Sequence, residues 1–507
     1  MTFEHLLEGA EILSQSGNPN IDGIEYDSRR IRPGNAFVAM HGGSSDGNKF
    51  IDKAISAGAV AIVTDSAIEK PRGGAAWAQV PHGRRALARI SANFYKRPAE
   101  RLAITGITGT NGKSTTAFLI ESILKAAGRK SALVGTIEYH IAGKILPAPH
   151  TTPEALELNR MLADALGHGA TEAVMEVSSH ALEQQRVFGI PFDVAVFTNL
   201  TRDHLDYHGT MEQYFASKQI LFEGCGTEPP RGAVINIDDE YGRKLLKLSK
   251  KRSAETLTYG LTSGDFHAGE VETNSRGTRF NLITPDRTVP LFSPLIGRVN
   301  VYNILAAAGA AYARDCDEQA IVRGVESLAR VPGRFERVDC KQPFTVVVDY
   351  AHTDDALRNL TALGREFVQR TRQRGRVITV FGCGGDRDRA KRPLMGEAAG
   401  KGSDFVVLTS DNPRSEDPLA IINDARVGLQ RSGTEYETEP DRKTAIALAI
   451  RKASPGDIVM IAGKGHEKVQ VTRGGSIPFD DVEVAQQVLR EAGYDCEAAN
   501  AAAGKTS

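Results

Sequence analysis

Residues 102–128, LAITGITGTNGKSTTAFLIESILKAAG, carry the clearest chemical signal in the chain. An apolar run leads into glycines, Lys113 and Ser114 follow, and apolar residues then recur at helical spacing. In such a unit, N–H groups at the helix start bind phosphate, the lysine lies against the β and γ phosphates, and the hydroxyl reaches Mg²⁺. The segment predicts an ATP or GTP site formed by Gly109, Thr110, Asn111, Gly112, Lys113, Ser114 and Thr115.

The glycine spacing in this segment differs from that of the usual phosphate loop. In the pattern G-x-x-x-x-G-K-[ST], the first glycine would stand at Ile107, but Gly106 and Gly109 flank that position instead. A glycine turn that precedes a helix by chance would not require the Lys-Ser-Thr sequence that follows. We therefore expect a nucleotide-binding loop of a variant type.

Three polar positions farther along the chain have both an ordinary and a functional interpretation. MEVSSHAL places Glu176 at the end of a predicted strand, where a carboxylate can hold the Mg²⁺ that bridges nucleotide phosphates. His204, in TNLTRDHLDYHG, would on its own be a surface or helix-capping histidine. Lys218, in YFASKQILF, would on its own be a surface lysine of an amphipathic helix.

GTNGKST resembles the ATP loop of the Mur ligases and of their folylpolyglutamate synthetase relatives, and the resemblance extends over nearly the whole chain. These proteins are ATP-dependent, amide-forming ligases with three domains. The resemblance implies catalytic roles for Lys113, Glu176, His204 and Lys218. It also implies two Mg²⁺ ions, for which the candidate ligands are Ser114, Glu176, His204 and Lys218.

In the Mur ligases, a lysine at the place of Lys218 is carbamylated by CO₂, and the resulting anion supports the second Mg²⁺. This modification is chemically reasonable, because an amine whose pKa falls on burial near cations becomes nucleophilic. The resemblance further implies that an asparagine of LIGRVNVYNILAAAGAA contacts adenine, with Asn300 and Asn303 as candidates. A helix-capping role explains at least one of these two asparagines equally well.

The segment EYDSRRIRPGNAFVAMHGGSSDG resembles the uridine-nucleotide site of the family, although on its own it would be an ordinary turn. The resemblance implies contacts to uracil and diphosphate from Tyr26, Ser28, Gly43, Ser44 and Ser45. Thr151 and Thr152 of PHTTPEALEL would serve equally well as helix caps, and the resemblance implies that they contact the sugar-peptide. Further contacts to that substrate are implied for Ser178, Gln184 and Arg186, and the arginine suits a carboxylate.

Residues 411–414, DNPR, resemble the signature of those family members that add meso-diaminopimelate. On its own, DNPR would be a proline turn after a strand. Diaminopimelate is lysine with an additional carboxylate at its far end, and a fixed guanidinium recognises a carboxylate better than an ammonium does. Leaving a buried arginine unpaired when lysine binds would cost about 2–5 kcal/mol. The resemblance implies an amino-acid site formed by Arg387, Asp411, Asn412, Pro413, Arg414, Gly463 and Glu467.

The elements that must position these residues alternate between apolar strands and helices. We expect an α/β protein of three domains with a flexible tail: a small N-terminal α/β domain, a central P-loop-type ATPase domain with a parallel sheet, and a C-terminal Rossmann-like domain. The expected ranges are 1–82 for the uridine-nucleotide domain, 83–333 for the ATP domain, 334–498 for the amino-acid domain and 499–507 for the tail.

Composition limits the classes of partner and compartment. The net charge of -1 gives no indication of nucleic-acid binding. The N-terminus lacks the features of a signal peptide, and no apolar run approaches the ~20 residues that span a bilayer. Five scattered cysteines favour a reducing compartment and argue against a disulfide framework or a zinc site. We expect a cytoplasmic monomer that binds small molecules, without nucleic-acid or membrane partners.

The resemblance implies an ATP-dependent ligase that joins meso-diaminopimelate to UDP-N-acetylmuramoyl-L-alanyl-D-glutamate through an acyl phosphate. A relative that adds L-lysine to the same nucleotide is the nearest alternative. Folylpolyglutamate synthesis is disfavoured by the first domain, and a non-catalytic nucleotide binder is disfavoured by Glu176, His204 and Lys218.

Overall fold

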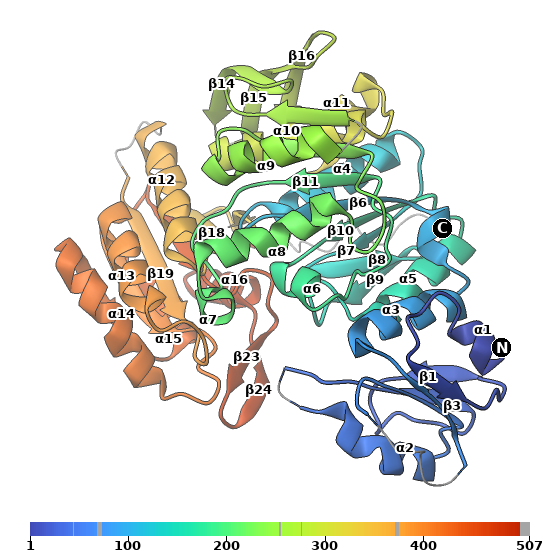
Figure 1. The fold of residues 1–507 in the computed structure, drawn as a ribbon. Coiled ribbons are helices and arrows are strands. Elements are labelled where there is room, and N and C mark those ends of the chain that lie inside the picture. The colour runs from blue at the N-terminus through green and yellow to red at the C-terminus, as the bar shows by residue number, and fades with distance from the viewer. Residues whose placement is uncertain (44, 68–73, 253–254, 275, 371–374, 497–507) are drawn as a thin grey trace.

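The computed structural model describes residues 1–43, 45–67, 74–252, 255–274, 276–370 and 375–496. Their strands form three large sheets that follow one another along the chain, together with a small antiparallel sheet and a hairpin. In Figure 1, the blue N-terminal part and the orange C-terminal part lie on different sides of the teal and green central part.

The first sheet has five strands in the order β1-β5-β4-β3-β2, and β1 is antiparallel to its neighbour. The buried face of α3 joins the core of this sheet through Ala86, Leu87 and Ile90. The strands are β1 (Ser14–Ser16), β2 (Gly23–Glu25), β3 (Asn35–Ala39), β4 (Ala61–Thr64) and β5 (Ala76–Gln79), and the helical segments are α1 (Phe3–Leu6), η1 (Gly47–Phe50), α2 (Ile51–Ser56) and α3 (Gly83–Phe94).

The central sheet has eight strands in the order β13-β12-β11-β6-β10-β7-β8-β9, and its last two strands run antiparallel to their neighbours. Its parallel strands β6, β10 and β11 lie side by side, so their carboxyl ends open at one edge. The strands are β6 (Ala103–Thr108), β7 (Ser131–Val134), β8 (Glu138–Ile141), β9 (Lys144–Pro147), β10 (Glu172–Glu176), β11 (Val194–Phe197), β12 (Gly232–Asn236) and β13 (Glu255–Tyr259).

Helices cover this sheet and bury its apolar side chains. Ile120 and Ile123 of α4 pack in one core with Ile304 and Leu305 of α10. The helical segments of the central part are η2 (Pro98–Arg101), α4 (Lys113–Ala126), α5 (Ala155–Gly167), α6 (Ser179–Glu183), α7 (Leu205–His208), α8 (Met211–Glu223), α9 (Glu240–Arg252), α10 (Arg298–Tyr312) and α11 (Glu318–Ser327).

A three-stranded antiparallel sheet covers part of the same core. It consists of β14 (His267–Asn274), β15 (Gly277–Ile283) and β16 (Thr288–Ser293), and Phe280 and Leu291 are buried in the core of the central part. The sequence pattern did not predict this sheet, because its strands alternate polar and apolar residues rather than forming continuous apolar runs.

The third sheet has the order β17-β18-β22-β19-β20-β21, and β17 is antiparallel to its neighbour. Helices pack on it, and along the chain a two-stranded hairpin follows β22 (Figure 1). The strands of the sheet are β17 (Glu336–Val338), β18 (Thr345–Asp349), β19 (Val377–Cys383), β20 (Phe405–Ser410), β21 (Glu435–Thr438) and β22 (Ile458–Ala462). The hairpin consists of β23 (Val469–Thr472) and β24 (Gly475–Pro478), and the helices are α12 (Asp354–Arg370), α13 (Lys391–Gly402), α14 (Pro418–Ser432), α15 (Arg442–Lys452) and α16 (Asp481–Glu491).

The predicted α/β class, with a phosphate loop after a central parallel strand and a second doubly wound sheet, is confirmed. The boundaries proposed at 82 and 333 remain predictions, although the three large sheets fall within residues 14–79, 103–259 and 336–462. The predicted tail, 499–507, lies outside the described residues. No described helix has both the length and the apolarity needed to cross a membrane.

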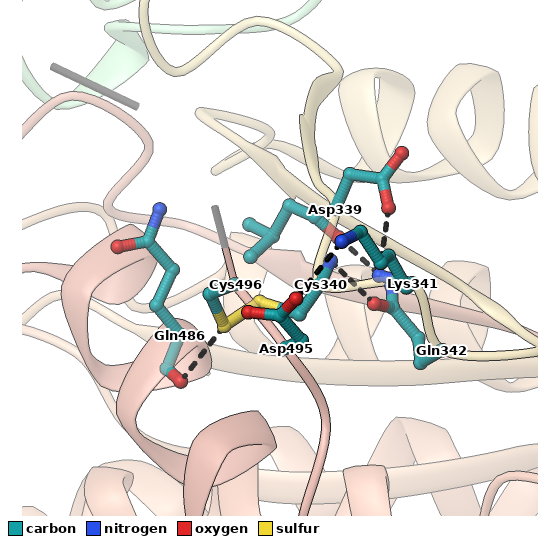
Figure 2. Close-up of a disulfide and its surroundings, with 8 residues drawn as sticks. Asp339, Cys340, Lys341, Gln342, Gln486, Asp495 and Cys496 are labelled. Carbon is teal, nitrogen blue, oxygen red and sulfur yellow. Dashed lines mark hydrogen bonds and ion pairs between the residues drawn. A yellow bond between two sulfur atoms is a disulfide. The ribbon is translucent and has the colours of Figure 1, made fainter. Parts of the chain in front are cut away.

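One disulfide corrects the expectation drawn from the cysteine count. Cys340, after β17, is bonded to Cys496, after α16, as Figure 2 shows. Lys341 and Asp495 pair beside it at 2.8 Å. The two cysteines are 156 residues apart, and because α16 packs beside β17 and β18, their segments meet in a way that sequence spacing could not reveal.

Candidate active site

The phosphate loop after β6 requires both of its glycines. Gly109 has φ 146°, and a Cβ there would lie 1.9 Å from the Thr198 hydroxyl oxygen. Gly112 has φ 86°, and a Cβ there would lie 2.4 Å from Oδ1 of Asn303. The close approach of these neighbours accounts for glycine at the two positions of the variant loop.

Two lysines converge on one carbonyl oxygen of this loop. Nζ of Lys113 donates to the carbonyl oxygens of Gly109 and Thr110 at 2.9 and 2.8 Å, and Nζ of Lys218 donates to that of Gly109 at 2.8 Å. Lys218 is only 2% exposed, so it is not the surface lysine that its helix alone would suggest. Burial and then the charge of Lys113 lower the pKa of Lys218 well below its usual value, and Asp203 opposes this shift.

A cavity of about 520 Å³ opens over the loop at the carboxyl ends of the central strands. Its walls come from the central part, from Arg334 and Phe335 before the third sheet, and from residues between Asp349 and Leu363 at β18 and α12, so both parts of the chain are needed to form it. The predicted site residues that line this cavity are Thr110, Asn111, Gly112, Lys113, Ser114, Thr115, Thr151, Glu176, Ser178, His204, Asn300 and Asn303.

The donors in this cavity suit Mg²⁺ bound together with phosphate. Ser114, Glu176 and His204 line it, and Asp203 contributes a carboxylate that the sequence did not single out. The Glu176 carboxylate is buried and accepts hydrogen bonds from the Thr136 backbone and hydroxyl at 2.7 and 2.9 Å. Among the described residues, no three His, Cys, Asp or Glu side chains form a ready-made metal cluster. This arrangement fits an ion that takes several ligands from phosphates and water.

Arg334 is a site residue that the sequence did not identify. Its Nη2 donates to the Ser114 hydroxyl oxygen at 3.1 Å, and its guanidinium lies 4.8 Å from the centre of the Tyr350 ring. Its buried Nε has no hydrogen-bond partner among the residues that the structure describes. A cation with an unused donor beside a phosphate loop is suited to an anionic ligand. The available signal was a basic residue directly after the predicted boundary at Pro332-Gly333.

Gly333 brings this arginine to the loop through a tight joint. It has φ 65°, and a Cβ there would lie 2.1 Å from the backbone nitrogen of His466. A second contact between the two parts comes from Asn111, whose Nδ2 donates to Asp355 at 3.0 Å. The joint therefore holds the third sheet close against the nucleotide cavity.

The two candidate adenine contacts lie together on α10. Nδ2 of Asn303 donates to Oδ1 of Asn300 at 3.1 Å, and Nδ2 of Asn300 donates to the Ile296 carbonyl oxygen at 2.9 Å. Gly297 is the N-cap residue of this helix, so neither asparagine caps it. Both are nearly buried and line the cavity, where an adenine role remains a prediction.

The candidate uridine-nucleotide residues differ from one another in burial and surroundings. The Tyr26 hydroxyl donates to the Glu157 carboxylate at 3.1 Å, and Tyr26 lines a separate cavity of about 910 Å³ between the first and central parts. Ser28 is buried, whereas Ser45 is exposed and no atom crowds Gly43. Ser44 lies outside the described residues.

The candidate sugar-peptide residues surround the start of α5 and α6. Neither Thr151 nor Thr152 caps α5, because Glu154 is its N-cap residue. The Thr152 hydroxyl instead donates to the Glu176 carbonyl oxygen at 2.8 Å, which supports the strand end. Arg186 pairs with Glu154 at 3.1 Å and donates to Gln184 at 2.7 Å, while the Ser178 hydroxyl oxygen caps α6.

The candidate amino-acid residues gather at the carboxyl ends of β20 and β22. Asp411, Asn412 and Pro413 are buried, and the buried Oδ1 of Asp411 has no hydrogen-bond partner among the described residues. Arg414 is half-buried, has φ 53°, and donates to the Gly385 carbonyl oxygen at 2.8 Å.

Three other candidates surround this group. Arg387 is exposed, but it lies near Arg414, because a Cβ on Gly384 would approach both side chains. A Cβ on Gly463 would lie 3.1 Å from Asp411. Glu467 accepts a hydrogen bond from Asn412 at 2.7 Å. The structure therefore brings the candidates from three loops into one cluster.

Fold and site together define a three-part α/β protein with a phosphate loop whose nucleotide cavity is closed by its C-terminal part. Family models match along the chain: "Mur ligase family, catalytic domain" at residues 20–95, "Mur ligase middle domain" at 107–311 and "Mur ligase, glutamate ligase domain" at 333–465. The chain belongs to the Mur ligase family.

Several similar proteins are named UDP-N-acetylmuramoyl-L-alanyl-D-glutamate–2,6-diaminopimelate ligase. One from Solibacter usitatus is 54% identical, with 94% of each chain covered. Another, from Geobacter metallireducens, is 46% identical over 93% of this chain and 94% of its own. A solved structure with this name has a TM-score of 0.68 at 35% identity and covers 97% of this chain and 99% of its own.

Proposed function

We propose that this chain is an ATP-dependent ligase that joins meso-2,6-diaminopimelate to UDP-N-acetylmuramoyl-L-alanyl-D-glutamate in peptidoglycan precursor synthesis. Such an activity serves cell-wall formation and, through it, cell shape and division. The observation that carries the choice of amino acid is Arg414, a half-buried guanidinium beside the buried Asp411 and Asn412. It offers a fixed cation for the carboxylate that distinguishes diaminopimelate from lysine.

The reaction proceeds in two displacements. The D-glutamate carboxylate attacks the γ-phosphorus of ATP, and the bond between this phosphorus and the β-phosphate oxygen breaks. ADP departs, and the carboxylate has become an acyl phosphate. The amine of diaminopimelate then attacks the acyl carbon, phosphate departs, and the nitrogen loses a proton to give the amide. Lys113 and Arg334 act by positioning and by neutralising phosphate charge. Mg²⁺, held by Ser114, Glu176 and His204, would add charge neutralisation when bound.

Lys218 carries a carbamate in this proposal. Its neutral amine adds to CO₂, which forms an N–C bond and releases one proton, so a cation is replaced by an anion. Support comes from its burial and its place beside Lys113 and the carbonyl oxygen of Gly109. The anion would help to hold a second Mg²⁺ and would offset the charge of Lys113.

The remaining substrate roles follow the family resemblance. Uracil and diphosphate are bound by Tyr26, Ser28 and the turn at Gly43 and Ser45, and the sugar-peptide by Thr151 and Arg186. Because Arg186 already pairs with Glu154 and Tyr26 with Glu157, these side chains are oriented by α5 and its N-cap before substrate arrives.

Phosphate release tests the function. With ATP and the UDP-dipeptide present, release is expected to depend on meso-diaminopimelate and to be much slower with L-lysine. Arg414→Met should raise the KM for diaminopimelate by about 30-fold or more, because the lost charge pair is worth at least ~2 kcal/mol. Turnover with lysine but not with diaminopimelate would contradict the assignment. ATP binding without phosphate release in the presence of all substrates would favour a non-catalytic nucleotide binder.

Labelled bicarbonate tests the carbamate. After exchange with ¹³C-bicarbonate, a carbamate carbon signal is expected from the native chain and should be missing from Lys218→Met. Lys250→Met on α9 is the control and should retain the signal. An identical spectrum from native protein and Lys218→Met would refute the modification at this residue.

A further inference from the structure

Lys464 is a buried cation behind the candidate amino-acid residues. It follows β22 and is fully enclosed, with an exposed fraction of 0%. Its Nζ donates to Oδ1 of Asn412 at 3.0 Å, to Oε2 of Glu467 at 3.0 Å and to the Val469 carbonyl oxygen at 2.6 Å. The three donors of this ammonium thus join three segments: the loop after β20, its own loop and the start of β23.

These bonds determine the orientation of Asn412. Its Oδ1 accepts a second hydrogen bond from the Val471 backbone N–H at 2.9 Å, so the side-chain oxygen must face Lys464. Its Nδ2 therefore points the other way and donates to Oε2 of Glu467 at 2.7 Å. Asn412 cannot rotate its amide without losing three hydrogen bonds.

Glu467 is held in the same way. Both of its hydrogen bonds reach Oε2, and within the described part of the chain none reaches Oε1, which is left for a ligand. Burial would raise the pKa of Glu467, but the charge and hydrogen bond of Lys464 and the hydrogen bond from Asn412 lower it below its usual value. The titratable or charged groups that face it are Lys464, His466, Tyr350, Asp411, Arg414 and Arg442.

We propose that Lys464 is the positioning residue that holds Asn412 and Glu467 in place to receive an ammonium group of the incoming amino acid. The inference rests on the proposed function, since it requires that this cluster binds the amino-acid substrate. Lys464 itself is enclosed and acts through Glu467. Without it, Asn412 and Glu467 lose their common anchor, and the partly buried carboxylate of Glu467 loses its countercharge.

A double-mutant cycle on Lys464 and Glu467 tests this role. Lys464→Met should raise the KM for diaminopimelate by about 10- to 100-fold, because hydrogen bonds to a charged group are lost. The KM values for ATP and for the UDP-dipeptide should stay within about 3-fold of the native values, given the separate nucleotide cavity. In a Glu467→Gln background, the same change should have a much smaller effect, because both residues act on one ligand group.

Lys468→Met is the matched control, because Lys468 lies in the same loop, is exposed and pairs with Asp480. It should leave all three KM values unchanged. Undiminished ADP binding establishes that each variant is folded, and Lys464→Gln replaces Lys464→Met if the latter does not fold.

Three results would overturn the inference: an unchanged KM for diaminopimelate in folded Lys464→Met, an equal rise in all three KM values, or full additivity with Glu467→Gln. Failure of the proposed function looks different, since the native chain would then show no diaminopimelate-dependent phosphate release. If the native chain uses lysine instead, the same cycle run with lysine still decides the role of Lys464, because lysine also carries ammonium groups.

Discussion

At the scale of single residues, Arg334 shows how a side chain from beyond the nucleotide-binding part completes the phosphate site. It contacts Ser114, the hydroxyl expected to meet Mg²⁺, and rests against the partly buried ring of Tyr350. The Tyr350 ring also lies 4.9 Å from the His466 ring, in the loop that contains Lys464. The Tyr350 ring therefore contacts both Arg334 at the phosphate site and the loop that carries Lys464.

Replacing Arg334 by lysine should lower kcat by about 100- to 1,000-fold, the usual loss when a donor to developing charge is removed. Lysine keeps the charge but has neither the planar fork nor the stacking surface. Steady-state kinetics would measure the loss, and the KM for diaminopimelate should change little. Arg330→Lys is the control, since Arg330 is exposed and pairs with Glu336. An equal kcat for both variants would mean that Arg334 does not contact the transferred phosphate.

Not every residue role could be predicted from sequence. The phosphate loop was predictable, because glycine, lysine and serine at fixed spacing have few alternative explanations. Burial of Lys218 was not, because a helical lysine is usually exposed and only the resemblance favoured a role. Arg334 and Lys464 were missed because their partners come from segments far away along the chain.

At the scale of elements, continuous apolar runs predicted the parallel strands, whereas the antiparallel additions were not predicted. The added strands β8 and β9 are short, and β9 is exposed along its whole length. Their polar side chains make contacts that a strand pattern does not encode. His140 of β8 lies between Glu121 of α4 and Glu138 of β8, 2.8 Å from each carboxylate.

This histidine should make stability depend on pH. Burial would lower the pKa of His140, but hydrogen bonds with Glu121 and Glu138 raise it to about 9. Since this value exceeds the ~6.5 of an unfolded chain, the stabilisation is complete below about pH 6.5 and is lost as the pH rises through about 9. In Glu121→Gln, the melting temperature should fall less over this range than in the native chain. Glu326→Gln, which changes an exposed residue, should behave like the native protein. Identical pH curves for Glu121→Gln and the native protein would show that the cluster is not coupled to folding.

At the scale of the whole molecule, the chain forms three large sheets one after another. Its C-terminal segment then packs back against the first strands of the third sheet. The segment after α16 comes back beside β17, where Cys496 meets Cys340 (Figure 2). This bond closes a long loop that contains every strand of the third sheet except β17, so it restricts the unfolded chain more than the folded one.

Removing the disulfide should destabilise the third part. Without reductant, Cys340→Ser should lower the free energy of unfolding by about 2–4 kcal/mol, measured by urea denaturation of the C-terminal transition. Dithiothreitol should bring the native chain to the level of the variant. If the two proteins unfold alike without reductant, the cysteines are not bonded in solution.

The joint at Gly333 has a genetic consequence. All four glycine codons share their first two bases, so any single change at either base replaces this residue with one that has a side chain or ends the chain. The backbone of His466 leaves no room for that side chain. In a living cell that depends on the enzyme, the first two bases of this codon should therefore tolerate no substitution. The third base can change, because every such change still encodes glycine.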